Sequence, residues 1–245
     1  MSLVYLKVIG CGDAFGSGGR LNTCFYVKTE TSKFLIDCGA SSLPGLKHHG
    51  ININDIDAIV ISHFHGDHYG GVPFLLLDAA IHGRKKKMQI ISPPGGKDRI
   101  SALLDLLYPG TSVLEKLNVD FLEYAADKVL KLEHFNLRAL PVIHSEKALP
   151  HGIRIEISDK VIAYSGDTSW TNTLLALSDK ADVFICECNF FGTQAKGHMN
   201  YLELEMRLPE FSCKRMLLTH FDQEMLEKLD QLKVGYLSDG FALMV

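Results

Sequence analysis

The chain has 245 residues, of which 47% are hydrophobic, and its formal net charge is −4. This length suits one large domain or two small ones, and the mild acidity argues against a protein built mainly to hold nucleic acid. No apolar run approaches the roughly 20 residues that cross a bilayer, and the first ten residues lack the pattern of a signal peptide. None of the six cysteines forms a CxxC pair, which is typical of reduced thiols in a cytoplasmic protein.

Hydrophobic periodicity and turn residues divide the chain into strands and helices. The first half predicts strands at residues 4–10, 23–29, 33–39, 56–62 and 87–92, and helices at 41–50, 71–83 and 95–110. The second half predicts strands at 119–125, 128–132, 135–143, 152–158, 160–166, 181–188, 214–220 and 241–245, and helices at 170–179, 201–211 and 222–232. Asn200 could cap the helix at 201–211, with Glu203 completing a capping box. Both halves pass through several strands and then alternate strand with helix, which favours two packed sheets with helices outside.

The stretch ISHFHGDHYGG directly follows the near-continuous apolar strand predicted at 56–62. It supplies four side chains of metal-ligand type: His63, His65, Asp67 and His68. In an extended turn the first two can point to one side, whereas the last two lie where the chain enters a helix and can point elsewhere. Imidazole and carboxylate are ligands of zinc, manganese and iron. Because so many such groups would be poorly solvated without a cation, the loop predicts a site for two metal ions.

Three later residues of ligand type also follow apolar strands. His144 follows the strand at 135–143, Asp167 follows that at 160–166, and His220 ends that at 214–220. Taken singly, the two histidines read as loop residues and Asp167 as the cap of the next helix. Their recurrence at strand ends instead favours further metal ligands.

The order HxHxDH, then His, GDT and TH resembles the metallo-β-lactamase superfamily over nearly the whole chain. The resemblance implies a single hydrolase domain over residues 1–245, with an α/β fold: a four-layer αββα sandwich of two mixed β-sheets flanked by helices. It also implies two divalent metal ions, with zinc favoured and manganese or iron as alternatives. The first ion would be bound by His63, His65 and His144, the second by Asp67, His68 and His220, and Asp167 would bridge them. Asp167 stands where class B β-lactamases often carry cysteine, which weakens the interpretation as an antibiotic hydrolase.

HFHGDH, SGDT and SDGFALMV are similar to the ribonuclease Z and phosphodiesterase branch of that superfamily. By this resemblance Glu187, in CECNFF, would orient His198, in GHMN, and His198 would stabilise or protonate the leaving oxygen. Two metal ions about 3.5–4 Å apart can generate hydroxide and clamp an in-line transition state. Asp67 or Asp167 could orient the attacking water, with His198 as general acid. Taken alone, His198 reads as a loop residue ahead of the Asn200 cap.

One departure from the branch bears on the substrate. Ribonuclease Z carries a long glycine- and proline-rich arm between its third histidine and the GDT motif, and uses it to grip transfer RNA. Here residues 145–166 predict only two short strands and a turn. The sequence therefore favours a phosphodiesterase that acts on a small-molecule, nucleotide or cyclic phosphodiester, or on a nucleic-acid end, rather than on transfer RNA.

Other functions stay open at this point. A carboxyl-ester, thioester or lactone hydrolase on the same fold would use nearly the same site and need not use Glu187 and His198. A non-catalytic metal or nucleic-acid binding module is disfavoured because all seven ligand-type residues are present, and an oxygen-reducing diiron protein would need a flavin domain. No membrane partner is expected, and a homodimer is possible because dimers are common in the resembled branch.

Two further stretches have simpler explanations. GRKKK, at residues 83–87, could steer phosphate, but a solvated turn explains it better. The glycine-rich stretch GCGDAFGSGGRLNT is not a GxGxxG motif, so a dinucleotide site is not predicted. Arg20 and Asn22 could still border the pocket, since this loop lies near the metals in the superfamily.

Overall fold

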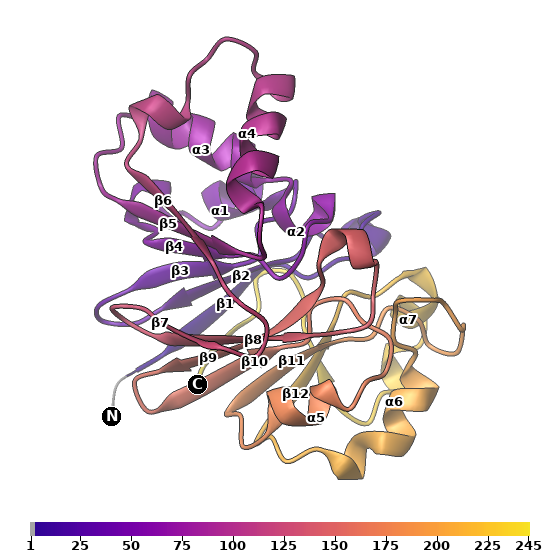
Figure 1. Cartoon of the computed structure of the whole chain (residues 1–245). Helices are drawn as coiled ribbons and strands as arrows, with labels where there is room; N and C mark the ends of the chain where they lie inside the picture. Colours follow the sequence, from indigo (N-terminus) through magenta and orange to yellow (C-terminus); the bar gives the residue numbers. More distant parts are fainter. Residues whose placement is uncertain (1–2) are drawn as a thin grey trace.

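Two seven-stranded β-sheets lie at the centre of the protein in the computed structural model, which describes residues 3–245 (Figure 1). Neighbouring strands follow the order β14-β1-β2-β3-β4-β5-β6 in the first sheet and β13-β12-β11-β10-β9-β8-β7 in the second. The strands of the first sheet are β1 (Tyr5–Gly10), β2 (Cys24–Lys28), β3 (Lys33–Ile36), β4 (Ala58–Val60), β5 (Met88–Ser92), β6 (Val119–Glu123) and β14 (Ala242–Met244). Those of the second are β7 (Val129–Lys131), β8 (Asn136–Pro141), β9 (His151–Ile157), β10 (Lys160–Tyr164), β11 (Val183–Glu187), β12 (Met216–Thr219) and β13 (Gly235–Tyr236). The α-helices are α1 (Ser42–His48), α2 (Gly66–Tyr69), α3 (Val72–Ile81), α4 (Gly96–Leu107), α5 (Thr173–Ser178), α6 (Tyr201–Arg207) and α7 (Gln223–Leu226).

Three hydrophobic clusters hold the layers together, one between the sheets and one under the helices on each outer face. Alternation along β2 shows how the sequence builds them, since successive side chains of a strand point to opposite faces. Phe25 and Val27 pack between the sheets, whereas Cys24 and Tyr26 pack on the helical side. Figure 1 shows α1, α3 and α4 outside the first sheet and α5 and α6 outside the second. The predicted αββα sandwich is therefore confirmed.

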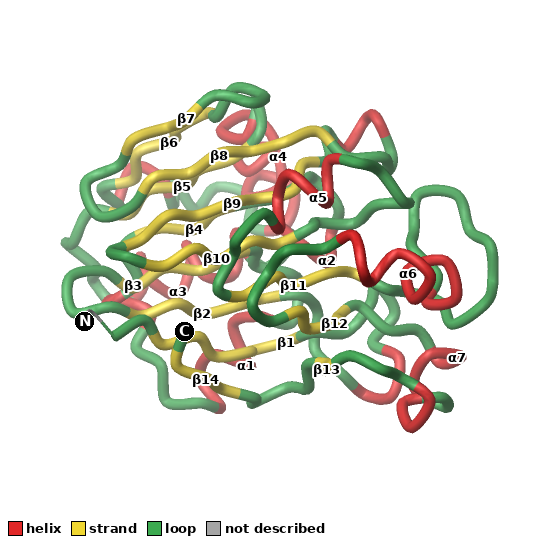
Figure 2. Tube along the Cα trace, turned by 90° about the horizontal axis from the view of Figure 1, so that it is seen from below, coloured by secondary structure: helices red, strands yellow, loops and turns green. Residues whose placement is uncertain are grey.

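Strand direction determines where a site can form. Strands β3 to β6 run parallel to one another, as do strands β10 to β13. Figure 2 shows the strands of both sheets running in nearly the same direction, with α6 and α7 beyond one end of them. In open α/β sheets, ligands bind outside the carboxyl ends of the strands. The residues that follow β4, β10 and β12 therefore collect at one edge of the sandwich.

Most predicted elements lie within a few residues of the observed ones, but the single helix predicted at 222–232 is wrong. Helix α7 ends at Leu226 and is followed only by a 3-10 turn over Leu229–Gln231. The chain turns back here because Gly235–Tyr236 pairs with β12, a strand that the sequence did not indicate. Asn200 caps α6 as predicted, since the backbone N–H of Glu203 donates to Asn200 Oδ1 at 3.0 Å.

The cysteines have the reduced state that the sequence predicts. All six cysteines are free, and five of them are buried. Within residues 3–245 no helix combines the length and the apolar character needed to cross a membrane.

The GRKKK stretch lies far from the edge described above and serves structure. Lys86 pairs with Asp57 before β4 and Lys87 with Asp120 near the start of β6, so both lie at the amino ends of strands. Arg84 is 3% exposed, and its guanidinium donates to four backbone carbonyls, those of Ile53, Ile56, Lys86 and Lys87, at 2.7–2.9 Å. The lysines of this turn are exposed to solvent, as expected. The buried Arg84 guanidinium holds the turn through its hydrogen bonds to the backbone.

We expect Arg84→Met to lower the free energy of unfolding by about 2–4 kcal/mol, because it leaves buried carbonyl groups without donors. Denaturant titration followed by circular dichroism measures this loss. Lys85→Met, at the exposed neighbouring position, is the matched control and should change stability by less than about 0.5 kcal/mol. Equal stability of the two variants would contradict the stabilising role of the Arg84 hydrogen bonds.

Candidate metal centre

All seven predicted ligand residues lie at the carboxyl edge of the sandwich. Four come from the loop between β4 and α2 and from α2 itself: His63, His65, Asp67 and His68. The other three follow single strands: His144 after β8, Asp167 after β10 and His220 after β12. The first sheet thus contributes one compact loop, and the second contributes three separate strand ends.

The first group of ligand atoms contains His63, His65, His144 and Asp167, all within 4.8 Å of one another. His144 Nε2 lies 3.0 Å from His65 Nδ1. Asp167 Oδ2 lies 3.8 Å from both His63 Nε2 and His144 Nε2. Three imidazole nitrogens and one carboxylate oxygen therefore converge, which is a donor set of the kind that zinc takes.

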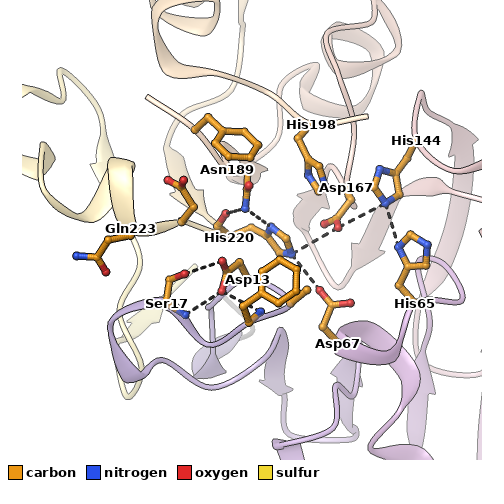
Figure 3. Close-up of a pocket in the computed structure, with 14 residues that line it drawn as sticks. Asp13, Ser17, His65, Asp67, His144, Asp167, Asn189, His198, His220 and Gln223 are labelled. Carbon is orange, nitrogen blue, oxygen red and sulfur yellow. Dashed lines mark hydrogen bonds and ion pairs between the residues drawn. The ribbon is translucent and has the colours of Figure 1, made fainter. Parts of the chain in front are cut away.

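The second group contains Asp67, His68, Asp167 and His220, again within 4.8 Å. Asp67 Oδ2 lies 3.2 Å from Nε2 of both His68 and His220. Asp167 presents Oδ1 to His68 Nε2 at 3.2 Å and Oδ2 to His220 Nε2 at 3.4 Å. Figure 3 shows Asp67, Asp167 and His220 pointing toward one another at the centre of the site. Asp167 belongs to both groups, and a carboxylate that bridges two ions must lie in this position.

Unpaired buried atoms show that these residues fit metal ions. Nε2 of His63, Nε2 of His68 and Oδ1 of Asp167 are buried and make no well-aligned hydrogen bond among the described residues, although His68 Nε2 lies 3.2 Å from both carboxylates. A buried polar atom without a partner costs about 1–3 kcal/mol. All three atoms belong to the two ligand groups, so cations in those groups would satisfy each of them.

The histidines of the two groups differ in the direction of their pKa shifts. Burial opposes a charge on His220, but Asp167 and the hydrogen bond to Asp67 raise the pKa of that imidazole to about 9. Burial likewise opposes a charge on His68, yet the Asp167 and Asp67 carboxylates raise its pKa well above the ordinary value. In the first group, burial and the charge of His68 hold the pKa of His63 well below the ordinary value. The second group therefore attracts protons where a cation would otherwise lie.

Metal binding in the second group should release about one to two protons at pH 7, because His68 and His220 must lose theirs to become ligands. Since the pKa of His220 is raised to about 9, its proton is held at pH 7 and leaves as the pH rises through 9. Metal affinity of this group should therefore increase with pH over that interval. Calorimetric titration with zinc in two buffers of different ionisation enthalpy measures the protons released.

The two groups supply matched controls for that titration. His65→Ala weakens the first group alone and should preserve the proton release, whereas His220→Ala should reduce it. Binding heats that do not depend on the buffer would contradict the charge distribution described above.

Three of the ligand histidines are held by a second contact through the other ring nitrogen. Ser62 Oγ lies 3.0 Å from His63 Nδ1, and the Gly197 carbonyl oxygen lies 2.7 Å from His144 Nδ1. His68 Nδ1 lies 2.7 Å from Asp37 Oδ2, deep in the protein. Such contacts select the tautomer that presents the free nitrogen to a metal.

Asp37 is a site residue that the sequence analysis missed. It is fully buried after β3, and its carboxylate also accepts hydrogen bonds from the backbone N–H and the hydroxyl of Ser62, both at 2.7 Å. A signal was available: in KFLIDCG an aspartate directly follows an apolar strand, as His63 and Asp167 nearly do. Because β3 is parallel to β4, that position lies beside the histidine loop.

Asp37→Asn should weaken zinc binding by about 10- to 100-fold, because a neutral amide orients and polarises His68 less well than a carboxylate. Competition with a chromophoric chelator measures the affinity. Asp57→Asn makes the same change at the amino end of β4, where the carboxylate accepts from the Lys33 N–H at 2.9 Å, and should leave affinity unchanged. If both variants bind zinc like the parent, Asp37 does not support the metal centre.

Glu187 and His198 form the pair that the sequence predicts. Glu187 Oε1 lies 2.8 Å from His198 Nδ1, and Glu187 is completely buried. Its two oxygens also accept the backbone N–H groups of Thr168 and Asn189 at 3.0 and 2.9 Å, so the carboxylate is fixed. Burial disfavours a charge on His198, but the hydrogen bond and charge of Glu187 outweigh it and raise the pKa of the imidazole above its ordinary value.

A pocket of about 470 Å³ opens over both ligand groups and over His198. The loop after β1 borders it through Asp13, Ala14, Phe15 and Ser17. Arg20 and Asn22, predicted to border it, do not line the pocket. They support the loop instead: Arg20 donates to the Leu237 carbonyl at 3.0 Å and Asn22 to the Asp13 carbonyl at 3.1 Å.

Comparison with known proteins places this arrangement among metallo-hydrolases. A ribonuclease Z from Clostridium acetobutylicum is 26% identical, over 90% of this chain and 88% of its own length. The probable metallo-hydrolase YhfI from Bacillus subtilis is 28% identical, over 88% of this chain and 86% of its own.

Solved structures show the same fold. The metallo-β-lactamase fold protein YhfI from Bacillus subtilis superimposes with a TM-score of 0.81 over the whole of both chains, at 22% identity. A diphosphatase from the PhnP family superimposes with a TM-score of 0.78 over 98% of this chain and 97% of its own, at 19% identity. A family model described as "Anti-Pycsar protein Apyc1" matches residues 4–239.

Proposed function

Because the chain belongs to the Anti-Pycsar protein Apyc1 family and is a metal-dependent hydrolase of the metallo-β-lactamase superfamily, we propose that it is a dinuclear phosphodiesterase. Its substrate would be a small or cyclic phosphodiester or a nucleic-acid end. The observation that carries the proposal is the pair of four-atom ligand groups that share Asp167, with Glu187 and His198 beside them. Two of the similar proteins are by name a ribonuclease and a diphosphatase, which supports chemistry at phosphorus.

Metal ligation is proposed as the resemblance to the superfamily implies it. His63, His65 and His144 would hold one ion, Asp67, His68 and His220 the other, and Asp167 both. Zinc is the proposed metal because imidazole-rich donor sets suit it, with manganese or iron as alternatives. Two divalent cations there would polarise the phosphoryl group and supply a nucleophilic water at neutral pH.

The side chains around the ions would guide the proton movements. Asp67 is 8% exposed and lines the pocket, so its carboxylate can orient the attacking water. His198 also lines the pocket, with Nδ1 held by Glu187 and Nε2 available to donate a proton to the leaving oxygen. Glu187 keeps that imidazole oriented and favours its protonated form.

The segment between His144 and Asp167 supports a small substrate. It forms a 3-10 turn at Glu146–Ala148 and the antiparallel pair β9–β10 within the second sheet. No part of it extends from the sandwich to hold a folded RNA. A pocket of about 470 Å³ is of the size that accommodates a small organic ligand. A homodimer and a cytoplasmic location stay predictions from the sequence.

Hydrolysis of bis(4-nitrophenyl) phosphate by zinc- and manganese-reconstituted protein tests the proposal. Turnover should require metal and disappear after chelation. If neither reconstituted form cleaves it while both cleave generic esters or lactones, the carboxyl-ester hydrolase of the same fold is the correct function.

A further inference from the structure

Phe15 is the most exposed large apolar side chain among the described residues, at 94%, and it lies on the border of the catalytic pocket. Other strongly exposed apolar side chains, such as Leu106 and Met206, lie on helices and do not line this pocket. Single exposed apolar residues are common on protein surfaces. The position of Phe15 over the reaction site is what needs an explanation.

The loop that carries Phe15 is held firmly at its base. Asp13 is 3% exposed, and its carboxylate accepts from the Phe15 N–H at 3.2 Å, the Ser17 N–H at 2.9 Å and the Ser17 hydroxyl at 2.7 Å. Figure 3 shows Asp13 and Ser17 joined in this way beside the ligand residues. Asp239 accepts from the backbone N–H groups of Cys11 and Leu21, at 3.0 and 2.7 Å, and so ties the two ends of the loop together.

Glycines then shape the tip of the loop. Gly16 and Gly18 have φ angles of 69° and 65°, a region that side chains rarely tolerate. A Cβ atom on Gly18 would lie 2.6 Å from Leu226 of α7, so the tip packs closely on that helix. These contacts therefore fix the backbone that carries Phe15 at the border of the pocket.

The rest of the pocket indicates what the ring would contact. Phe190 supplies a second aromatic ring, and Asp222 and Gln223 supply polar groups. No lysine or arginine is among the lining residues that the structure describes. Outside the metal centre the pocket therefore suits an uncharged, planar organic group better than additional phosphates.

We propose that Phe15 is a specificity-determining residue, which stacks on a planar aromatic ring, such as a nucleobase, in the organic part of the substrate. This inference rests on the proposed phosphodiesterase function. Stacking would position the ring at the mouth of the pocket while the phosphodiester lies at the metal centre. Substitution of Phe15 should therefore alter discrimination between ligands with and without a ring, rather than the chemical step.

Two product-like ligands test the proposal without a turnover assay: thymidine 5′-phosphate and 2-deoxyribose 5-phosphate, which differ in the base. Isothermal titration of the zinc-loaded protein should show that the nucleotide binds about 10-fold more tightly or better. Phe15→Ala should reduce this preference by about 5- to 50-fold, Phe15→Leu should also lose it, and Phe15→Trp should keep it. Met206→Ala, at an exposed apolar position away from the pocket, should have no effect.

Three results would overturn the proposal. These are an unchanged preference in Phe15→Ala, equal weakening of both ligands, or a change of oligomeric state with the preference intact. Hydrolysis assays on the same proteins separate this inference from the proposed function. Absence of phosphodiester turnover in the parent would remove the function, whereas the binding preference would still decide the role of Phe15.

Discussion

Replacement of Asp167 by asparagine is expected to reduce kcat/KM for bis(4-nitrophenyl) phosphate by about 10³-fold or more and to lower the bound metal below two ions per chain. Asp167 is 2% exposed and is the one residue common to both ligand groups. Its two oxygens face His68 and His220 at 3.2 and 3.4 Å. An amide is neutral and offers one acceptor oxygen, so it cannot serve both groups. Loss of several kcal/mol of charge stabilisation corresponds to a rate loss of this size.

The metal content of Asp167→Asn should be measured together with its rate, by mass spectrometry after desalting. Asp222→Asn is the matched control, because Asp222 lines the same pocket but belongs to neither ligand group. The Asp222 carboxylate accepts from the Met225 N–H at 2.9 Å and so caps α7, and the asparagine of this control would keep the cap, since asparagine caps helices well. Two bound ions and near-parental turnover in Asp167→Asn would refute the shared-carboxylate arrangement.

Removal of the His198 imidazole should produce the second largest loss. We expect His198→Ala to lower kcat for phosphodiester hydrolysis by about 10²- to 10⁴-fold, the usual contribution of a positioned general acid. The loss should be smaller for a nitrophenolate leaving group than for an alkoxide, because nitrophenolate needs less help to depart. Comparing methyl 4-nitrophenyl phosphate with a dialkyl phosphodiester therefore distinguishes a proton donor from a general binding contact.

The pH profile gives an independent measure of the same role. A general acid must be protonated, so activity should fall as the pH rises through the pKa of His198. Burial by itself would lower that pKa, but the hydrogen bond and charge of Glu187 raise it above the ordinary value. In Glu187→Gln the alkaline limb should therefore move to lower pH, and in His198→Ala it should vanish.

Metal content distinguishes a proton donor from a metal ligand at position 198. This control is needed because Glu187, His198 and His220 also offer ligand atoms within 4.8 Å of one another. A His198→Ala protein that retains its metal but loses turnover supports the proton donor. One that loses metal would show that His198 acts as a ligand. His134→Ala, in the turn between β7 and β8, is the control and should behave like the parent.

The sequence by itself determined the layered fold and the chemical type of the site, for a physical reason. A buried strand reads as an apolar run, and parallel strands deliver whatever follows them to one edge of the sheet. His63, Asp167 and His220 each come shortly after such a run, so a cluster of metal ligands could be predicted without knowing the packing. The division of the ligands between two ions came from the resemblance to a known superfamily, and the structure groups the same residues in the same way.

Only the tertiary structure decided the features that depend on contacts between distant segments. Asp37 reaches His68 because β3 and β4 are parallel neighbours, and periodicity within one strand carries no information about its neighbour. The helix predicted at 222–232 is interrupted because the chain turns back to pair with β12, which outweighs local helical preference. Phe15 reads as an ordinary loop residue until Asp13 and Asp239 are seen to hold its loop beside the ligand groups. Long-range strand pairing and loop placement depend on contacts between distant segments. The ligand side chains and the strand pattern can instead be recognised in short stretches of the sequence.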